Sequence, residues 1–146
     1  MIRRVIVAGF AALALAGCGS ASPSAARLQA QTARVCTRAS AQGARIAPPR
    51  VPAQSAAFLR RGIAVLRGEL TDLRALHAPS EQAGAYSAAL ASLAHELAIL
   101  AATAHDLDRG ADPLTTIKTL QHRLAPIEAN DAAAWRTLGV PACVNR

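Results

Sequence analysis

The chain has 146 residues, a formal net charge of +7 and few aromatic residues, namely two Phe, one Tyr and one Trp. This length is enough for one domain with one core and too short for two. Abundant Ala and Leu with so few aromatic residues favour closely packed helices over a β-sandwich, which needs alternating Val, Ile, Thr and aromatic residues.

Residues 1–17 have the pattern of an export signal. Arg3 and Arg4 form a basic start, and an apolar run extends from Val5 to Ala16. A run of about a dozen apolar residues is too short to span a bilayer as a helix. We therefore expect residues 1–17 to be a signal peptide.

The sequence Leu15-Ala16-Gly17-Cys18 resembles the lipobox of bacterial lipoproteins. The resemblance implies cleavage before Cys18 and attachment of a diacylglycerol to its sulfur. Two or three acyl chains on one cysteine make a durable anchor, because each buried methylene contributes about 0.8 kcal/mol and one chain binds only marginally. Residues 18–25 would then be a lipidated tether on the extracytoplasmic face of the cell membrane. The alternative is an ordinary signal peptide cut nearby, which leaves Cys18 as a thiol.

Removal of Arg3 and Arg4 with the signal peptide lowers the net charge from +7 to +5. A basic surface can indicate a polyanionic partner. An exported protein meets phospholipid headgroups and wall polymers before it meets a genome, so anionic lipid or wall polymer is the expected partner and nucleic acid is not.

Two cysteines remain once Cys18 is lipidated, Cys36 and Cys143. An even pair in an oxidising compartment predicts a disulfide. Neither residue lies in a CxxC motif or beside a histidine, so a redox or metal role has little support.

Residues 26–146 predict four helices. The first runs to about Ile46, where Pro48 and Pro49 end it, and the second spans residues 54–77 with leucines at alternating spacings of four and three. Ser80 is the expected cap of the third helix and Gly110 its left-handed stop.

The fourth helix is expected to begin at Asp112-Pro113 and to end at Gly139. Pro126 lies inside it and predicts a kink or a split near residues 123–125. Four helices with short connections predict an all-α, up-down-up-down antiparallel four-helix bundle. That topology brings Cys36 and Cys143 to the same end, whereas a helical pair extended into an oligomer explains them less well.

The chain is similar to small lipoproteins of high-GC actinobacteria, which are generally of unknown activity. The similarity rests on the lipobox, an early helical Cys, a Pro-rich first connection and two structural motifs, Leu73-Arg74-Ala75-Leu76-His77-Ala78-Pro79 and Leu138-Gly139-Val140-Pro141-Ala142-Cys143. It implies an anchor, a bundle and a disulfide, and it assigns no catalytic residue.

Nothing in the sequence assembles a catalytic or metal site. The serines lie in predicted helices or caps without a GxSxG elbow. His95 and His105 are about 80° apart around the third helix and about 15 Å apart along it, too far for one ion. We therefore expect no enzyme, no cofactor and no metal, and a metal- or haem-binding bundle is the alternative.

Arginine is concentrated in the first half. Residues 18–78 carry nine Arg against Glu69 and Asp72. The seven-residue repeat of Arg60, Arg67 and Arg74 predicts one stripe on the second helix. With Arg34 and Arg38 of the first helix, these arginines are candidate contacts for an anionic surface. The favoured alternative is a solvated face partly paired with acidic residues of the third and fourth helices.

Two further binding functions stay open. A small apolar ligand could lie near Tyr86 and Trp135, between Ala-lined seams. A protein partner could bind at Asn130 and Asp131, which interrupt the apolar pattern, unless a bend at Pro126 simply turns them to water. The sequence thus indicates a membrane-anchored, non-enzymatic binding or envelope-interaction module whose ligand it does not name.

Overall fold

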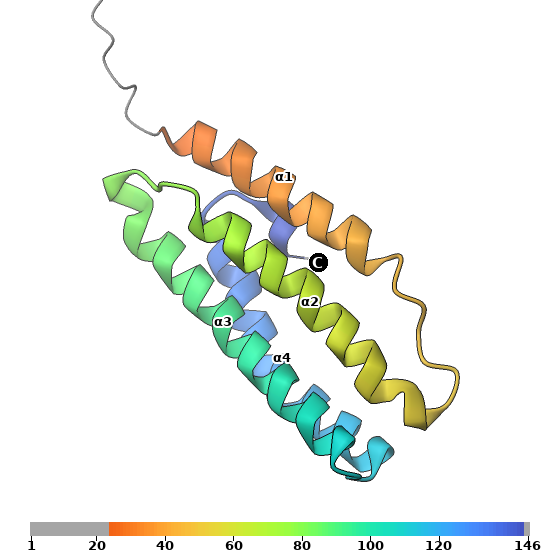
Figure 1. Ribbon diagram of the computed structural model, residues 1–146. Helices are drawn as coiled ribbons and strands as arrows, with labels where there is room; N and C mark the ends of the chain where they lie inside the picture. The colour runs from red at the N-terminus through yellow and green to blue at the C-terminus, as the bar shows by residue number, and fades with distance from the viewer. Residues whose placement is uncertain (1–23, 145–146) are drawn as a thin grey trace, which may run out of the picture.

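The computed structural model describes residues 24–144 (Figure 1). Its regular elements are α1 (Ala25–Gly43), η1 (Pro52–Gln54), α2 (Ser55–Arg74), α3 (Ser80–Asp108), α4 (Pro113–Thr137) and η2 (Pro141–Cys143). All regular structure in this range is helical, η1 and η2 being short 3-10 helices, so the predicted all-α class with four long helices is confirmed. The predicted signal peptide and Cys18 lie outside the described residues, as does the predicted tether up to residue 23.

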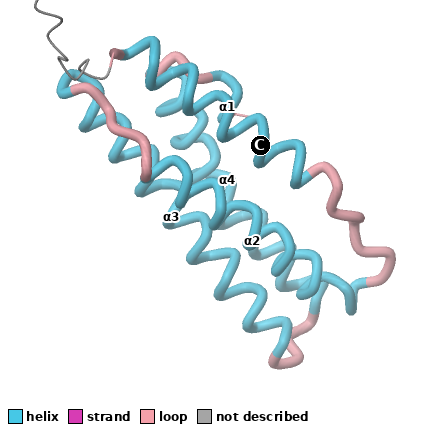
Figure 2. Tube along the Cα trace, turned by 45° about the horizontal axis from the view of Figure 1, so that its top comes forward, coloured by secondary structure: helices cyan, strands magenta, loops and turns pink. Residues whose placement is uncertain are grey.

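The central helix of the bundle is α3. It makes the most extensive contacts in the structure, with α2 on one side and α4 on the other. The first helix, α1, packs mainly on α2 and on η2, near the end of the chain. Figures 1 and 2 show the consecutive long helices turning back on one another, with the extended segment between α1 and η1 at one end of the bundle.

Side chains cap the N-termini of two helices, at Ser24 and at the predicted position Asp112. Ser24 Oγ accepts a hydrogen bond from the Arg27 amide at 3.2 Å, and Asp112 Oδ1 accepts one from the Thr115 amide at 2.9 Å. These caps satisfy amides that have no partner inside the helix. Hydrogen bonding to the Thr115 amide lowers the pKa of the exposed Asp112 carboxyl, which favours its charged form.

The predicted Ser80 cap is wrong. Pro79 takes the N-cap position with an extended backbone, and Ser80 is the first helical residue. The Ser80 hydroxyl donates instead to Glu81 Oε2 at 3.4 Å. The helix begins one residue early because the extended backbone of Pro79 already supplies the non-helical geometry of a cap.

Two glycines end helices in the left-handed conformation. Gly110 has φ of 90° and Gly139 has φ of 72°. The next residue after each glycine donates back to a carbonyl five residues earlier, Ala111 to Asp106 and Val140 to Trp135. This is the Schellman motif, in which glycine avoids the strain that a side chain would bring.

The fourth helix passes through Pro126 as one element from Pro113 to Thr137, so the predicted split at residues 123–125 does not occur. Proline has no amide hydrogen and leaves the carbonyl of His122 without its helical donor. Pro126 and His122 are both exposed. The interruption therefore lies on the solvent side, where water can replace the missing donor.

The core lies along the seams of α2, α3 and α4, with Leu73, Leu93 and Trp135 fully buried. By length and composition, α3 is the one described helix that could cross a membrane. Its large apolar side chains are directed into the bundle, and its exposed positions are alanine, glycine or polar residues. A core helix that is covered on two sides has this composition, and burial among α2 and α4 accounts for it.

A matched pair of leucines tests this core. Leu73 is fully buried, whereas Leu114 is 70% exposed. Leu73→Ala leaves a cavity and should lower the free energy of unfolding by about 2–5 kcal/mol. Leu114→Ala should change it by less than about 0.5 kcal/mol. Urea unfolding followed by circular dichroism measures both, and equal effects would contradict the assigned core.

Candidate functional site

The predicted cysteine pair is brought together. The Cys36 and Cys143 sulfurs are 1.99 Å apart, which is disulfide distance, and their Cα atoms are 5.1 Å apart across 107 residues of sequence. Both side chains are fully buried. A bond here ties the middle of α1 to η2, and burial shields it from reducing thiols.

A side chain of α1 holds the same region. Gln29 Nε2 donates a hydrogen bond to the Leu138 carbonyl at 3.0 Å, at the end of α4. Gly139 lies directly beneath this amide, since a Cβ built on it would be 2.7 Å from Gln29 Nε2. Gly139 is therefore needed for space as well as for its positive φ.

The interior next to the Cys36 and Cys143 pair contains the aromatic side chains of Tyr86 and Trp135 and the carboxylate of Asp131. Tyr86 and Trp135 pack edge to face with ring centroids 6.1 Å apart. The Tyr86 hydroxyl donates to the Leu73 carbonyl at 2.8 Å. Burial raises the pKa of Tyr86, and the neighbouring Thr32 hydroxyl offsets part of the rise. Tyr86 is therefore a neutral packing residue at physiological pH.

Asp131 is only 5% exposed and accepts a hydrogen bond from Trp135 Nε1 at 3.0 Å. The expectation that it faces water or a partner is therefore wrong, whereas Asn130 is exposed as expected. The pattern of apolar residues could not predict that Asp131 is buried. In such a pattern a carboxylate counts as an exposed polar position, and only the structure shows the indole N–H of Trp135 that compensates its burial.

The predicted apolar ligand site near Tyr86 and Trp135 has no support in the residues 24–144. The two rings contact each other, and neither of them lines any of the surface hollows described below. The four histidines are all exposed, on different turns and helices. Within the described part of the chain, no three His, Cys, Asp or Glu side chains gather closely enough to hold a metal ion.

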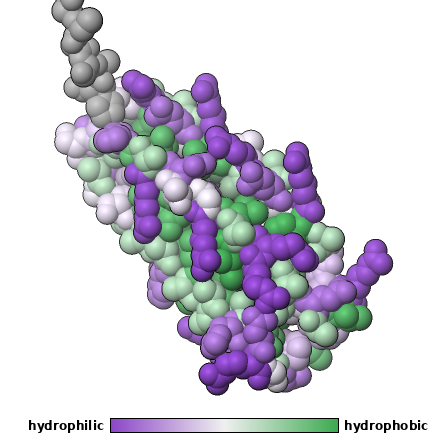
Figure 3. All heavy atoms as spheres, in the orientation of Figure 1, coloured by the Kyte–Doolittle hydropathy of each residue, from purple (hydrophilic) through white to green (hydrophobic). Residues whose placement is uncertain are grey.

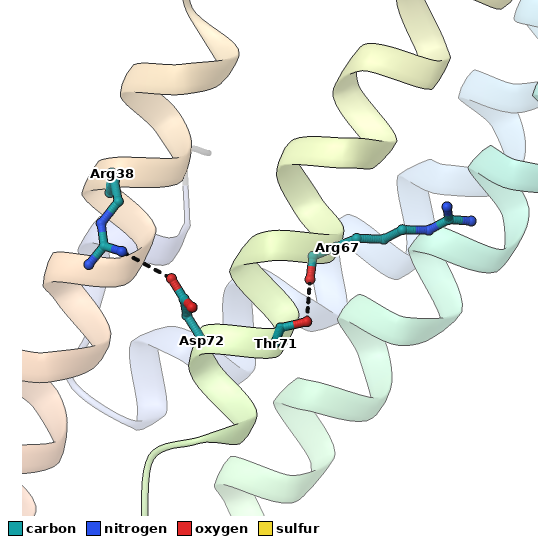
Figure 4. Close-up of polar contacts among 4 residues, drawn as sticks. All are labelled: Arg38, Arg67, Thr71 and Asp72. Atoms are coloured by element: carbon teal, nitrogen blue, oxygen red, sulfur yellow. Dashed lines mark hydrogen bonds and ion pairs between the residues drawn. The ribbon is translucent and has the colours of Figure 1, made fainter.

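The predicted arginine contacts divide into two groups. Arg38 Nη1 lies 3.0 Å from Asp72 Oδ2 (Figure 4), and Arg60 forms an ion pair with Asp108 of α3. Arg34, Arg67 and Arg74 are exposed and form no ion pair with any residue between Ser24 and Val144.

Arg67 extends from α2 toward α3 in Figure 4, away from the Arg38 and Asp72 pair. Figure 3 shows long hydrophilic side chains standing out from this face of the bundle. The stripe predicted from the seven-residue repeat is therefore only partly free: Arg67 and Arg74 carry its remaining positive charge, and Arg34 of α1 is likewise without an ion pair among the described residues.

The surface hollows of the described residues include three that are distinguished by the elements lining them. One of about 380 Å³ lies between α2 and α3 and includes the Arg60 and Asp108 pair. A second of about 570 Å³ lies between residues 49–52 and α4 and is lined by Val51 and Leu114, the two large apolar residues that are exposed. A third of about 490 Å³ lies between α3 and α4 and is mainly polar.

Sequence reasoning predicted none of these three hollows. A signal existed for the third in the polar run Thr115-Thr116 and Thr119, which places three hydroxyls on the first turns of a helix. No family model, no curated protein and no solved structure matches this chain.

The cysteine link gives a direct prediction. Replacing both residues with alanine should lower the free energy of unfolding by about 2–5 kcal/mol, because the reduced chain gains conformational entropy when unfolded. Urea unfolding of the double variant measures this, and the wild type in reducing agent should match it. Two titratable thiols in wild-type protein unfolded without reductant would contradict the bond.

Proposed function

We propose that this protein is a lipid-anchored, extracytoplasmic binding module without catalytic activity. The observation that carries the proposal is the Cys36 and Cys143 pair at disulfide distance. A buried disulfide of this kind belongs to an oxidising compartment. It thus supports export independently of Leu15-Ala16-Gly17-Cys18, whose order supports lipidation of Cys18.

The disulfide pair and the lipobox-like sequence together account for all three cysteines of the chain. The third, Cys18, lies in the lipobox-like sequence, which needs a cysteine that forms no disulfide. Cys36 and Cys143 occupy each other, so Cys18 has no partner within the chain and is left for the anchor.

The same proposal assigns Arg34, Arg67 and Arg74 to contact with anionic lipid or wall polymer. They are exposed, they form no ion pair among the described residues, and they lie on the adjacent helices α1 and α2. Arg38 and Arg60, which sequence alone included, already have carboxylate partners and contribute less. Each unpaired arginine near an anionic surface adds up to about 1 kcal/mol.

Lipidation is tested by Cys18→Ala in the native host. Cells fed an alkyne fatty acid should label the wild type, and the protein should enter the detergent phase in a phase-partition assay, whereas Cys18→Ala should lose the label. The Cys36→Ala/Cys143→Ala variant is the control and should keep it. Label that persists in Cys18→Ala, or a wild type without label, would refute the anchor.

The arginine contact is tested with residues 24–146, which lack Cys18. This domain should co-sediment with vesicles containing phosphatidylglycerol at low salt, and less with phosphatidylcholine alone. Arg67→Gln/Arg74→Gln should weaken binding by about tenfold, because two charges near the surface are removed. Lys118→Gln/Arg136→Gln removes the same charge from α4 and should weaken binding less. Equal weakening, or no dependence on anionic lipid, would overturn the assignment.

A further inference from the structure

The third hollow, between the end of α3 and the start of α4, has the composition of an anion site. It has a volume of about 490 Å³ and is open to solvent. Its lining includes two arginines and three threonines from the end of α3 and the first three turns of α4: Arg109, Arg123, Thr115, Thr116 and Thr119. Leu120 and Thr103 are buried and form its floor.

The threonine hydroxyls that line this hollow are not all engaged in the same way. Thr71, Thr103 and Thr137 each donate their hydroxyl to the carbonyl four residues earlier, at 2.9–3.0 Å. The Thr115 side chain hydrogen-bonds to the Asp112 carboxylate. Thr116 and Thr119 form no side-chain hydrogen bond with any residue of the described range. Their hydroxyls are therefore available as donors to a ligand.

The two guanidinium groups are available as well. Arg109 follows the last residue of α3, and Arg123 lies on the third turn of α4. Both are exposed, and neither forms an ion pair within residues 24–144. The carboxylate of Asp106 also borders the hollow, so the charge there is +1.

The two other hollows differ in composition. Between α2 and α3, Asp108 neutralises Arg60, and the rest of the lining, which includes Arg67, offers no hydroxyl donor. The hollow between residues 49–52 and α4 includes Arg50 and Lys118 but is mainly apolar. The hollow between α3 and α4 combines two arginines without an ion pair in the described residues with threonine hydroxyls and a mainly polar lining.

We propose that this hollow binds the phosphoryl group of a polyol phosphate. Arginine matches phosphate oxygens with paired N–H donors, and threonine hydroxyls complete the set. A volume of about 490 Å³ exceeds the size of inorganic phosphate and lies within the usual range for small-ligand sites. The remaining space adjoins hydroxyls, which suits a polyol better than an apolar group.

This site is separate from the anchor and from Arg34, Arg67 and Arg74, so its test is independent of both. The full chain is purified in a non-ionic detergent and titrated calorimetrically with glycerol 3-phosphate. Saturable binding is expected, and glycerol without the phosphate should give none. Arg109→Gln/Arg123→Gln should weaken binding at least about tenfold. Arg136→Gln, on α4 outside the hollow, should leave it unchanged.

A second variant tests the site in case Arg109→Gln/Arg123→Gln does not fold. Thr119→Val keeps the shape of an exposed side chain and removes one donor, and it should weaken binding a few-fold. Absence of saturable binding by the wild type, or equal weakening by Arg136→Gln, overturns the proposal.

Two arms identify the source of the phosphate. Micelles doped with phosphatidylglycerol that abolish glycerol 3-phosphate binding indicate a lipid headgroup. Doped micelles that leave it unchanged indicate a soluble or polymeric phosphate. Either result retains the phosphoryl site.

Discussion

The link between α1 and the end of the chain is the constraint on which the arrangement depends. The first helix packs mainly on α2 and η2, and its buried seam includes Thr32 and Ala39 as well as larger apolar residues. Such a seam buries less apolar surface than that of α3. The Cys36 and Cys143 contact and the Gln29 hydrogen bond to Leu138 therefore add attachment of α1 to the bundle beyond what its hydrophobic burial provides.

Sequence patterns predicted the elements of this fold because each rests on local chemistry. Alternating spacings of four and three gave the helices, and Gly110 and Asp112 gave the turn between α3 and α4. The prediction that Ser80 caps α3 was wrong, because either Pro79 or Ser80 could take the N-cap position and Pro79 takes it. Pro126 was predicted to kink or split the fourth helix, and the split does not occur. Its exposure was invisible in the sequence, and an exposed interruption costs less than a buried one.

Predicting the candidate sites was harder, since they depend on contacts between helices. The seven-residue repeat placed Arg60, Arg67 and Arg74 on one stripe, but only the packing of α2 against α3 shows that Asp108 meets Arg60. Asp131 likewise counted as polar and was expected outside, although Trp135 supplies a donor for it in the interior. Pairing across helices decides which charges remain free, and one sequence does not contain it.

The position of the hollow between α3 and α4 bears on the origin of its ligand. The tether would join the start of α1, which lies at the opposite end of the bundle from the turn between α3 and α4 (Figure 1). The 29 residues of α3 extend about 43 Å at 1.5 Å per residue. With the bundle upright on its anchor, that distance carries the hollow well beyond the headgroups of the anchoring bilayer. An upright bundle would therefore present Arg109 and Arg123 to soluble or polymeric phosphate, while only a bundle lying along the bilayer could bring them to a lipid headgroup.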